Sequence, residues 1–268
     1  MDITSGNLAN PKISSVRDTS TLFEVCVDSI ESAVNAIKGG ADRLELCSAL
    51  LTGGLTPSTS LLREVKKIAE NKPVFVMIRL RDGDYCYTDK EIEIMKMELI
   101  DLKSCGADGF VFGLLKQDGT IDAKGCSELL SMAFPLPCTF HKAFDVADVD
   151  IQTLVQLGFK RVLTSGKRKN ITKGITEIKT LIAQSGGKII ILPGGGITKN
   201  NICTIVKETG AKEIHGSFSL AKHSDMLNKA VDFSSDFRQG GYFTRTVTSQ
   251  ELLGEAKLLV QKSINHSF

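Results

Sequence analysis

Short apolar segments alternate with longer amphipathic segments along most of the chain, and the pattern repeats eight times. Alternating apolar and polar residues predict strands, whereas apolar residues three or four positions apart predict helices. The predicted strands cover residues 23–28, 43–47, 74–79, 107–112, 138–141, 161–164, 188–192 and 213–215. The predicted helices cover residues 29–39, 58–70, 88–104, 123–133, 149–157, 171–184, 199–208 and 250–262.

This alternation of strand and helix is typical of an α/β protein with a parallel sheet. Eight repeats within 268 residues, without a second domain, favour a closed, TIM-like (β/α)8 barrel over an open sheet. We expect the barrel to span residues 21–268. Residues 1–20 are rich in Ser, Thr and Asn and predict a disordered lead-in. Residues 222–248 are expected to be irregular, and a lid, an oligomer contact and disorder all stay open for them.

The first two predicted strands each have one charged face, which is unusual because parallel strands are commonly apolar on both faces. Residues two apart on a strand share a face. The polar face of the first strand carries Glu24, Cys26 and Asp28, and that of the second carries Arg43, Glu45 and Cys47. A polar face turned toward the interior of a barrel predicts a functional site.

Composition narrows the class of protein. The net charge is +2 with acids and bases interspersed, so neither a nucleic-acid partner nor a membrane surface is expected. No apolar run approaches the roughly 18 residues that a membrane span needs. The chain has seven cysteines, an odd number scattered over strands and helices, which argues against a disulfide framework and for a reduced, cytosolic protein.

Barrel enzymes and binding proteins place their chemistry at the carboxyl ends of the strands. The polar-face residues that we expect there are Glu24, Cys26, Arg43, Glu45, Cys47, Arg79, His141, Glu213 and His215, with Asp145 just beyond the fifth strand. Buried charges are costly unless they pair. A satisfied Arg–Glu network without chemical function is therefore the alternative for any single member of this set.

Two of these residues, Cys26 and Cys47, face the same interior from adjacent strands. Two thiolates without a third or fourth cysteine nearby suit a soft ion of low coordination number, such as Cu(I), better than a closed tetrahedral zinc site. The alternative is that both are small hydrophobic core residues, which is the commoner role of buried cysteines. The five other cysteines receive no function: Cys86, Cys105, Cys126, Cys138 and Cys203.

His141 and His215 close the fifth and eighth strands, where they could act as acid–base groups or metal ligands. A structural hydrogen bond is the alternative for each. Gly194, Gly195 and Gly196 follow the seventh strand and precede a helix, a pattern typical of a backbone anion cradle. The alternative for this run is a tight strand-to-helix turn.

The chain resembles the CutC family of copper homeostasis proteins in ordered blocks from about residue 22 to 220. The blocks are residues 23–29 (FEVCVDS), 39–48 (GGADRLELCS), 53–58 (GGLTPS), 76–79 (VMIR), 106–113 (GADGFVFG), 139–145 (TFHKAFD), 161–166 (RVLTSG) and 193–197 (PGGGI). The resemblance is strongest to the animal members. The loop at residues 79–85 departs from the family pattern, and Lys142 stands where the family has arginine, so a bidentate arginine contact is not available there.

The resemblance implies a (β/α)8 barrel that takes part in intracellular copper handling, in the cytoplasm and also in the nucleus. It implies that copper, as Cu(I), binds at Cys26 and Cys47, and that the protein self-associates as a dimer or tetramer. The copper ion is then its partner.

Two hypotheses follow for function. In the first, Cys26 and Cys47 bind Cu(I) to buffer or shuttle it, with Glu24 and Glu45 supporting the ligands. In the second, the barrel is an enzyme for a small anionic or phosphorylated substrate. Its anion-binding residues would be Arg43, Arg79, Gly194, Gly195 and Gly196, and its proton-transfer residues would be His141, Glu45, Glu213 and His215.

Overall fold

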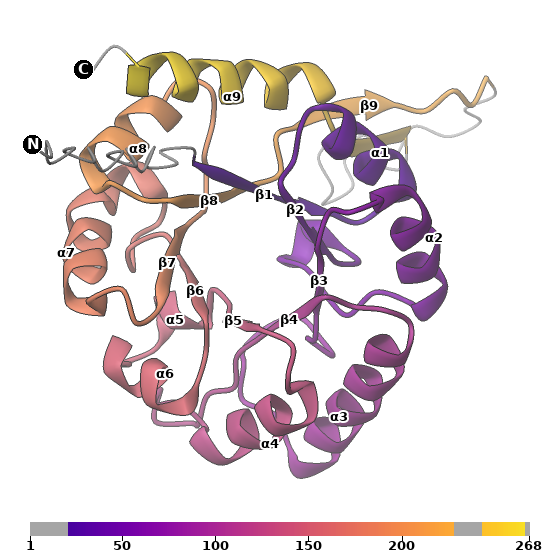
Figure 1. Ribbon diagram of the computed structural model, residues 1–268. Coiled ribbons are helices and arrows are strands. Elements are labelled where there is room, and N and C mark those ends of the chain that lie inside the picture. The colour runs from indigo at the N-terminus through magenta and orange to yellow at the C-terminus, as the bar shows by residue number, and fades with distance from the viewer. Residues whose placement is uncertain (1–20, 228–242, 266–268) are drawn as a thin grey trace, which may run out of the picture.

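Eight parallel strands form a ring surrounded by helices in the computed structural model, which describes residues 21–227 and 243–265 (Figure 1). The strands are β1 (Leu22–Val27), β2 (Arg43–Leu46), β3 (Val74–Met77), β4 (Gly109–Phe112), β5 (Cys138–Phe140), β6 (Arg161–Thr164), β7 (Ile190–Pro193) and β8 (Glu213–Gly216). Their order is β7-β6-β5-β4-β3-β2-β1-β8, and β7 lies beside β8 where the ring closes. The predicted (β/α)8 barrel is confirmed.

One long helix follows each strand, as predicted. These helices are α1 (Ile30–Lys38), α2 (Thr59–Ala69), α3 (Asp89–Ser104), α4 (Ala123–Ala133), α6 (Ile151–Leu157), α7 (Ile175–Ser185), α8 (Ile202–Thr209) and α9 (Gln250–Asn265). Two short helical elements were not predicted, the helix α5 (Ala143–Val146) and the 3-10 turn η1 (Leu50–Thr52). The helix predicted over residues 171–184 is divided into the 3-10 turn η2 (Ile171–Lys173) and α7. No helix in the described ranges is long and apolar enough to cross a membrane.

Local sequence signals explain where several helices begin. Ser29 and Ser58 cap α1 and α2, because each side chain accepts a hydrogen bond from a backbone N–H of the first turn. Thr88 and Glu91 form a complete capping box at the start of α3.

Both faces of the central strands are buried, but with different chemistry. The face of β1 that packs against the helices holds Phe23, Val25 and Val27, each at most 1% exposed. The face toward the barrel interior holds Glu24, which is 0% exposed. The predicted polar interior is therefore real, and its charges must be satisfied within the barrel.

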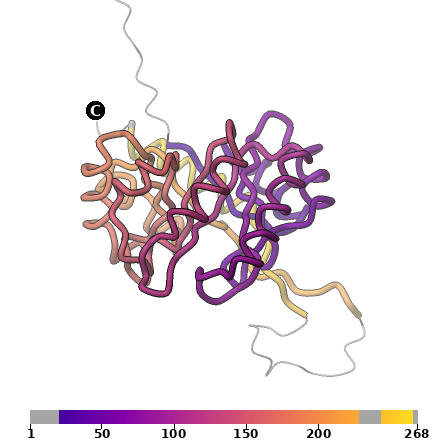
Figure 2. The backbone as a smooth tube through the Cα atoms, turned by 90° about the horizontal axis from the view of Figure 1, so that it is seen from below, coloured from indigo at the N-terminus to yellow at the C-terminus, as the bar shows by residue number. Residues whose placement is uncertain are grey.

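The expectation of an irregular segment at residues 222–248 is wrong at both of its described ends. There β9 (Ser219–His223) and β10 (Thr244–Thr248) pair antiparallel. Ion pairs from Glu31 of α1 to Lys222 and Arg245 anchor this two-stranded ribbon, which extends away from the ring of helices (Figure 2). Residues 228–242 of the same segment, and the expected lead-in at residues 1–20, lie outside the described residues.

Candidate functional site

A cavity of about 750 Å³ opens at the carboxyl ends of the barrel strands. Loops after β2, β3, β5, β6, β7 and β8 line it together with the interior face of the strands, and β10 contributes Thr246 and Thr248. The predicted site residues that line it are Cys26, Glu45, Arg79, His141, Gly195, Gly196 and His215. This is the end of a barrel at which functional sites are built.

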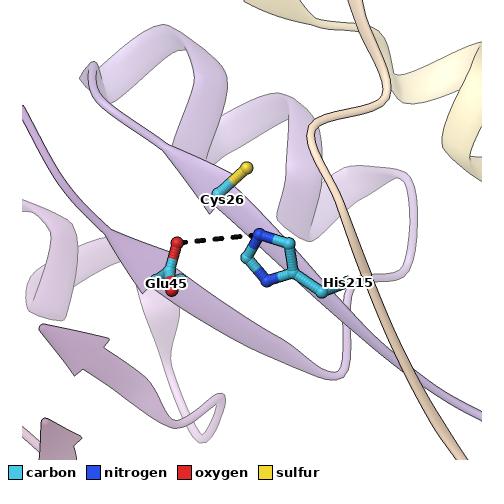
Figure 3. Close-up of side chains that lie close together, drawn as sticks. All are labelled: Cys26, Glu45 and His215. Atoms are coloured by element: carbon cyan, nitrogen blue, oxygen red, sulfur yellow. Dashed lines mark ion pairs between the residues drawn. The ribbon is translucent and has the colours of Figure 1, made fainter. Parts of the chain in front are cut away.

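Cys26, Glu45 and His215 form the group in the described part of the chain that could hold a metal ion. One ligand atom of each lies within 4.8 Å of the others (Figure 3). Strand register brings them together, because Cys26 lies opposite Glu45 in the β1–β2 pair and His215 lies on β8, the other neighbour of β1. His215 Nε2 is 3.7 Å from Glu45 Oε2. The sequence named all three residues but did not predict that they form one group.

His215 is held between two carboxylates. Its Nδ1 lies 2.8 Å from Glu24 Oε1, while Nε2 faces Glu45. Burial alone would lower the pKa of His215, but Glu45 and Cys26 outweigh it and hold that pKa well above its usual range. These neighbours favour the protonated imidazole, and a metal ion at this ring would compete with that proton.

Glu45 is the least satisfied of the three side chains. Burial raises the pKa of its carboxyl group, which His215 offsets only in part. Its Oε1 atom is buried and has no hydrogen-bond partner in the described structure. A proton acceptor or a ligand atom is thus available in the middle of the group.

Cys47 is placed differently from Cys26. It is 0% exposed and packs in a small apolar cluster with Phe75, Met77 and Val111. Its thiol donates to Glu45 Oε2 at 3.6 Å, and burial raises its pKa well above the usual range. Cys26, in contrast, is partly exposed and lines the cavity. The two cysteines share the interior face, as predicted, with Glu45 contacting Cys47 and grouped with Cys26.

Arg43 and Glu213 do not lie at the carboxyl ends, and the expectation that they do is wrong. They are the first residues of β2 and β8. Arg43 bonds to Glu24 and, at 2.5 Å, to Glu213, which also pairs with Arg161 at 2.8 Å. Arg43 and Arg161 line a different hollow at the amino ends of the strands. These side chains form the satisfied ion-pair network that the sequence left open as an alternative.

Arg79 lines the cavity, and both of its Nη atoms donate within the protein, whereas its Nε is buried without a partner among the described residues. Its Nη1 donates to the carbonyl oxygens of Thr52 and Gly54 at 2.8 and 3.1 Å, and its Nη2 donates to Gly83 at 3.1 Å. The side chain therefore ties together the loops after β2 and β3. Its guanidinium also lies 5.1 Å from the ring centroid of Tyr85.

His141 differs from His215 in its charge. Burial and the nearby Arg79 lower its pKa to about 3, so the ring is neutral. Its Nδ1 accepts a hydrogen bond from the backbone N–H of Ala143, and its Nε2 is buried without a partner among the described residues.

The first glycine of the run at residues 194–196 differs from the other two in its position. Gly194 is buried and its N–H bonds to the carbonyl of Thr164, whereas Gly195 and Gly196 line the cavity. Lys142, which the sequence noted only as a departure from a family pattern, also lines the cavity beside this run. The sequence feature that could have identified Lys142 as a cavity residue is its position next to His141 at the end of a predicted strand.

The fold and the site define a (β/α)8 barrel with a Cys–Glu–His group at the carboxyl end. Residues 21–220 match the CutC family, and the chain therefore belongs to it. A human protein described as a copper homeostasis protein CutC homolog is 51% identical over 208 residues, which are 76% of each chain. The mouse counterpart is 50% identical over 226 residues, 82% of this chain and 83% of its own.

One solved structure agrees with this assignment, and a second shares the fold. CutC from Streptococcus agalactiae superposes with a TM-score of 0.70 at 35% identity, covering 74% of this chain and 98% of that one. A thiamine phosphate pyrophosphorylase from Pyrococcus furiosus superposes with a TM-score of 0.56 at 14% identity, covering 92% of this chain and 98% of that one. The second likeness shows the barrel fold alone.

Proposed function

We propose that this protein binds Cu(I) at the barrel mouth through Cys26 and Cys47, and that it buffers or shuttles copper inside the cell. The observation that carries the proposal is the cavity-lining thiol of Cys26, grouped with an imidazole and a carboxylate within 4.8 Å. The description of the human and mouse relatives as copper homeostasis proteins supports it.

The donor set suits copper in its soft, reduced state. Thiolates select Cu(I), and imidazole is also a copper ligand, whereas carboxylates are poor ligands for it. Cys26 and Cys47 would hold the ion, with His215 as the additional nitrogen donor. Glu45 contacts the Cys47 thiol and His215, so it is placed to accept the protons that metal binding releases.

Glu24 would act as the outer partner of this site. It bonds to His215 Nδ1, which fixes the imidazole ring and leaves Nε2 directed toward the group. Self-association and a cytoplasmic or nuclear location stay predictions of the proposal.

Anaerobic titration of the reduced protein with Cu(I), against a competing chelator, tests the proposal. We expect Cys26→Ser to weaken binding by more than the roughly 10–100-fold that loss of an outer partner costs. Cys47→Ser should do the same if both thiolates bind the ion. Cys203→Ser is the matched control, because this partly exposed cysteine lies on α8 and does not line the cavity.

Wild-type affinity in a folded Cys26→Ser variant would overturn the proposal. If only Cys47→Ser bound Cu(I) with wild-type affinity, Cys47 would not be a ligand, and Cys26 and His215 would be the ligand pair. Circular dichroism of each variant confirms that the barrel is intact.

A further inference from the structure

Two backbone N–H groups on the β7 side of the mouth have no acceptor within the described structure. They belong to Gly195 and Gly196, which line the cavity and have φ angles of +97° and +86°. Gly195 is partly buried and Gly196 is exposed, and the N–H groups of successive residues in a turn form concave sites for anions. A side chain at Gly195 would fill this space, because its Cβ would lie 3.2 Å from the Cβ of Ser165.

Lys142 brings a positive charge to the same place. Its Nζ lies 3.3 Å from the position that a Cβ on Gly195 would take, and it has no ion-pair or hydrogen-bond partner among residues 21–227 and 243–265. Two other cationic side chains line this side of the cavity, and both have partners within the protein. Lys167 donates to backbone carbonyls at 3.0 and 3.2 Å, and Arg168 pairs with Glu177.

Asp145 also lines this side of the cavity, but hydrogen bonds within the protein already occupy its carboxylate. Its carboxylate accepts bonds from the hydroxyl groups of Thr164 and Ser165 and from the backbone N–H groups of Ser165 and Lys167. These bonds hold the loop after β6 against α5, which carries Asp145. Among the described residues that line this side of the cavity, the charge left without a partner is therefore the positive charge of Lys142.

An independent observation also points to a ligand in this cavity. His141 is 3% exposed, and its Nδ1 accepts a hydrogen bond from Ala143, which assigns the ring proton to Nε2. That Nε2–H donor is buried without an acceptor in the described residues. A buried donor costs stability until an acceptor reaches it. The acceptor would come from a molecule in the cavity.

We propose that the β5–β7 side of the mouth binds the phosphate group of a small phosphorylated molecule. The Gly195 and Gly196 amides and Lys142 would hold the phosphate, and His141 Nε2 would donate to an oxygen elsewhere in the ligand. The loops after the seventh and eighth strands are the usual place for phosphate in such barrels. A cavity of about 750 Å³ is large enough for a ligand of drug size.

This inference does not rest on copper binding, since the Cys–Glu–His group lies on β1, β2 and β8. The test is isothermal titration of the reduced, copper-free full chain with inorganic phosphate, ribose 5-phosphate and ribose. We expect the two phosphates to bind and ribose not to bind.

Lys142→Met should weaken the binding of inorganic phosphate and of ribose 5-phosphate at least roughly tenfold, the effect of losing one charge-assisted hydrogen bond. The matched control is Lys188→Met, which removes an exposed lysine that does not line the cavity and should bind as wild type. His141→Gln should weaken ribose 5-phosphate but not inorganic phosphate. Equal losses in the Lys142 and Lys188 variants, or no phosphate binding by wild type, would overturn the proposal.

Discussion

Replacing Arg43 by methionine should destabilise the barrel strongly. Arg43 is 3% exposed, and its guanidinium joins two buried carboxylates, those of Glu24 and Glu213. Removing one partner of a buried ion pair typically costs about 3–5 kcal/mol, because it leaves an uncompensated charge. Glu213 keeps Arg161 in the variant, so most of the cost falls on Glu24.

The pKa of Glu24 gives an independent value for the free energy that its charged partners contribute to stability. Burial alone would raise it, but Arg43 and His215 lower it from 4.5 to about 2. At about 1.4 kcal/mol per pKa unit, this shift corresponds to about 3 kcal/mol. The folded-state pKa is depressed, so this stabilisation is present above pH 4.5 and is lost as the pH falls toward 2. His215 supplies part of it, and we therefore expect Arg43→Met to cost about 3 kcal/mol at pH 7.

Urea unfolding followed by circular dichroism measures this cost. The control is Arg168→Met, whose ion pair with Glu177 is exposed and should contribute less than about 1 kcal/mol. The double variant Arg43→Met, Glu24→Gln should recover part of the loss, since it removes the unpaired charge. A cost below about 1 kcal/mol for Arg43→Met would refute the reasoning. So would a folded Arg43→Met protein that has lost phosphate binding, because Arg43 would then act at the mouth.

Two further predictions concern pH and helix capping. His141 has a pKa of about 3 in the folded protein, so below about pH 6.5 its ring takes up a proton on unfolding but stays neutral in the folded state. The free energy of unfolding should therefore decrease as the pH falls below about 6.5. Between pH 6 and 4.5, unfolding experiments should show wild type losing about 2 kcal/mol more than His141→Gln, and parallel pH profiles would contradict this. Thr88→Ala removes the capping box with Glu91 and should cost about 1 kcal/mol in urea unfolding. Thr180→Ala, in an exposed mid-helix position, is its control and should not destabilise the protein.

Local patterns in the sequence were sufficient for the barrel. Alternation in β1 and β2 located both strands and identified their polar interior faces, because side chains on a strand change sides at every residue. Capping residues such as Ser58 and Thr88 located the starts of helices, since these signals act within one turn. The ribbon of β9 and β10 was missed, because its pairing depends on contact with α1 rather than on a local pattern.

The site required the tertiary structure. Alternation shows which face a residue occupies but not its height along the barrel axis. Arg43 and Cys47 share one face, yet they are four positions apart, which is roughly 13 Å along a strand. Register between strands then brought Cys26, Glu45 and His215 together. The sequence by itself therefore determined the fold and the polar interior, whereas strand height and register decided which of those polar residues meet.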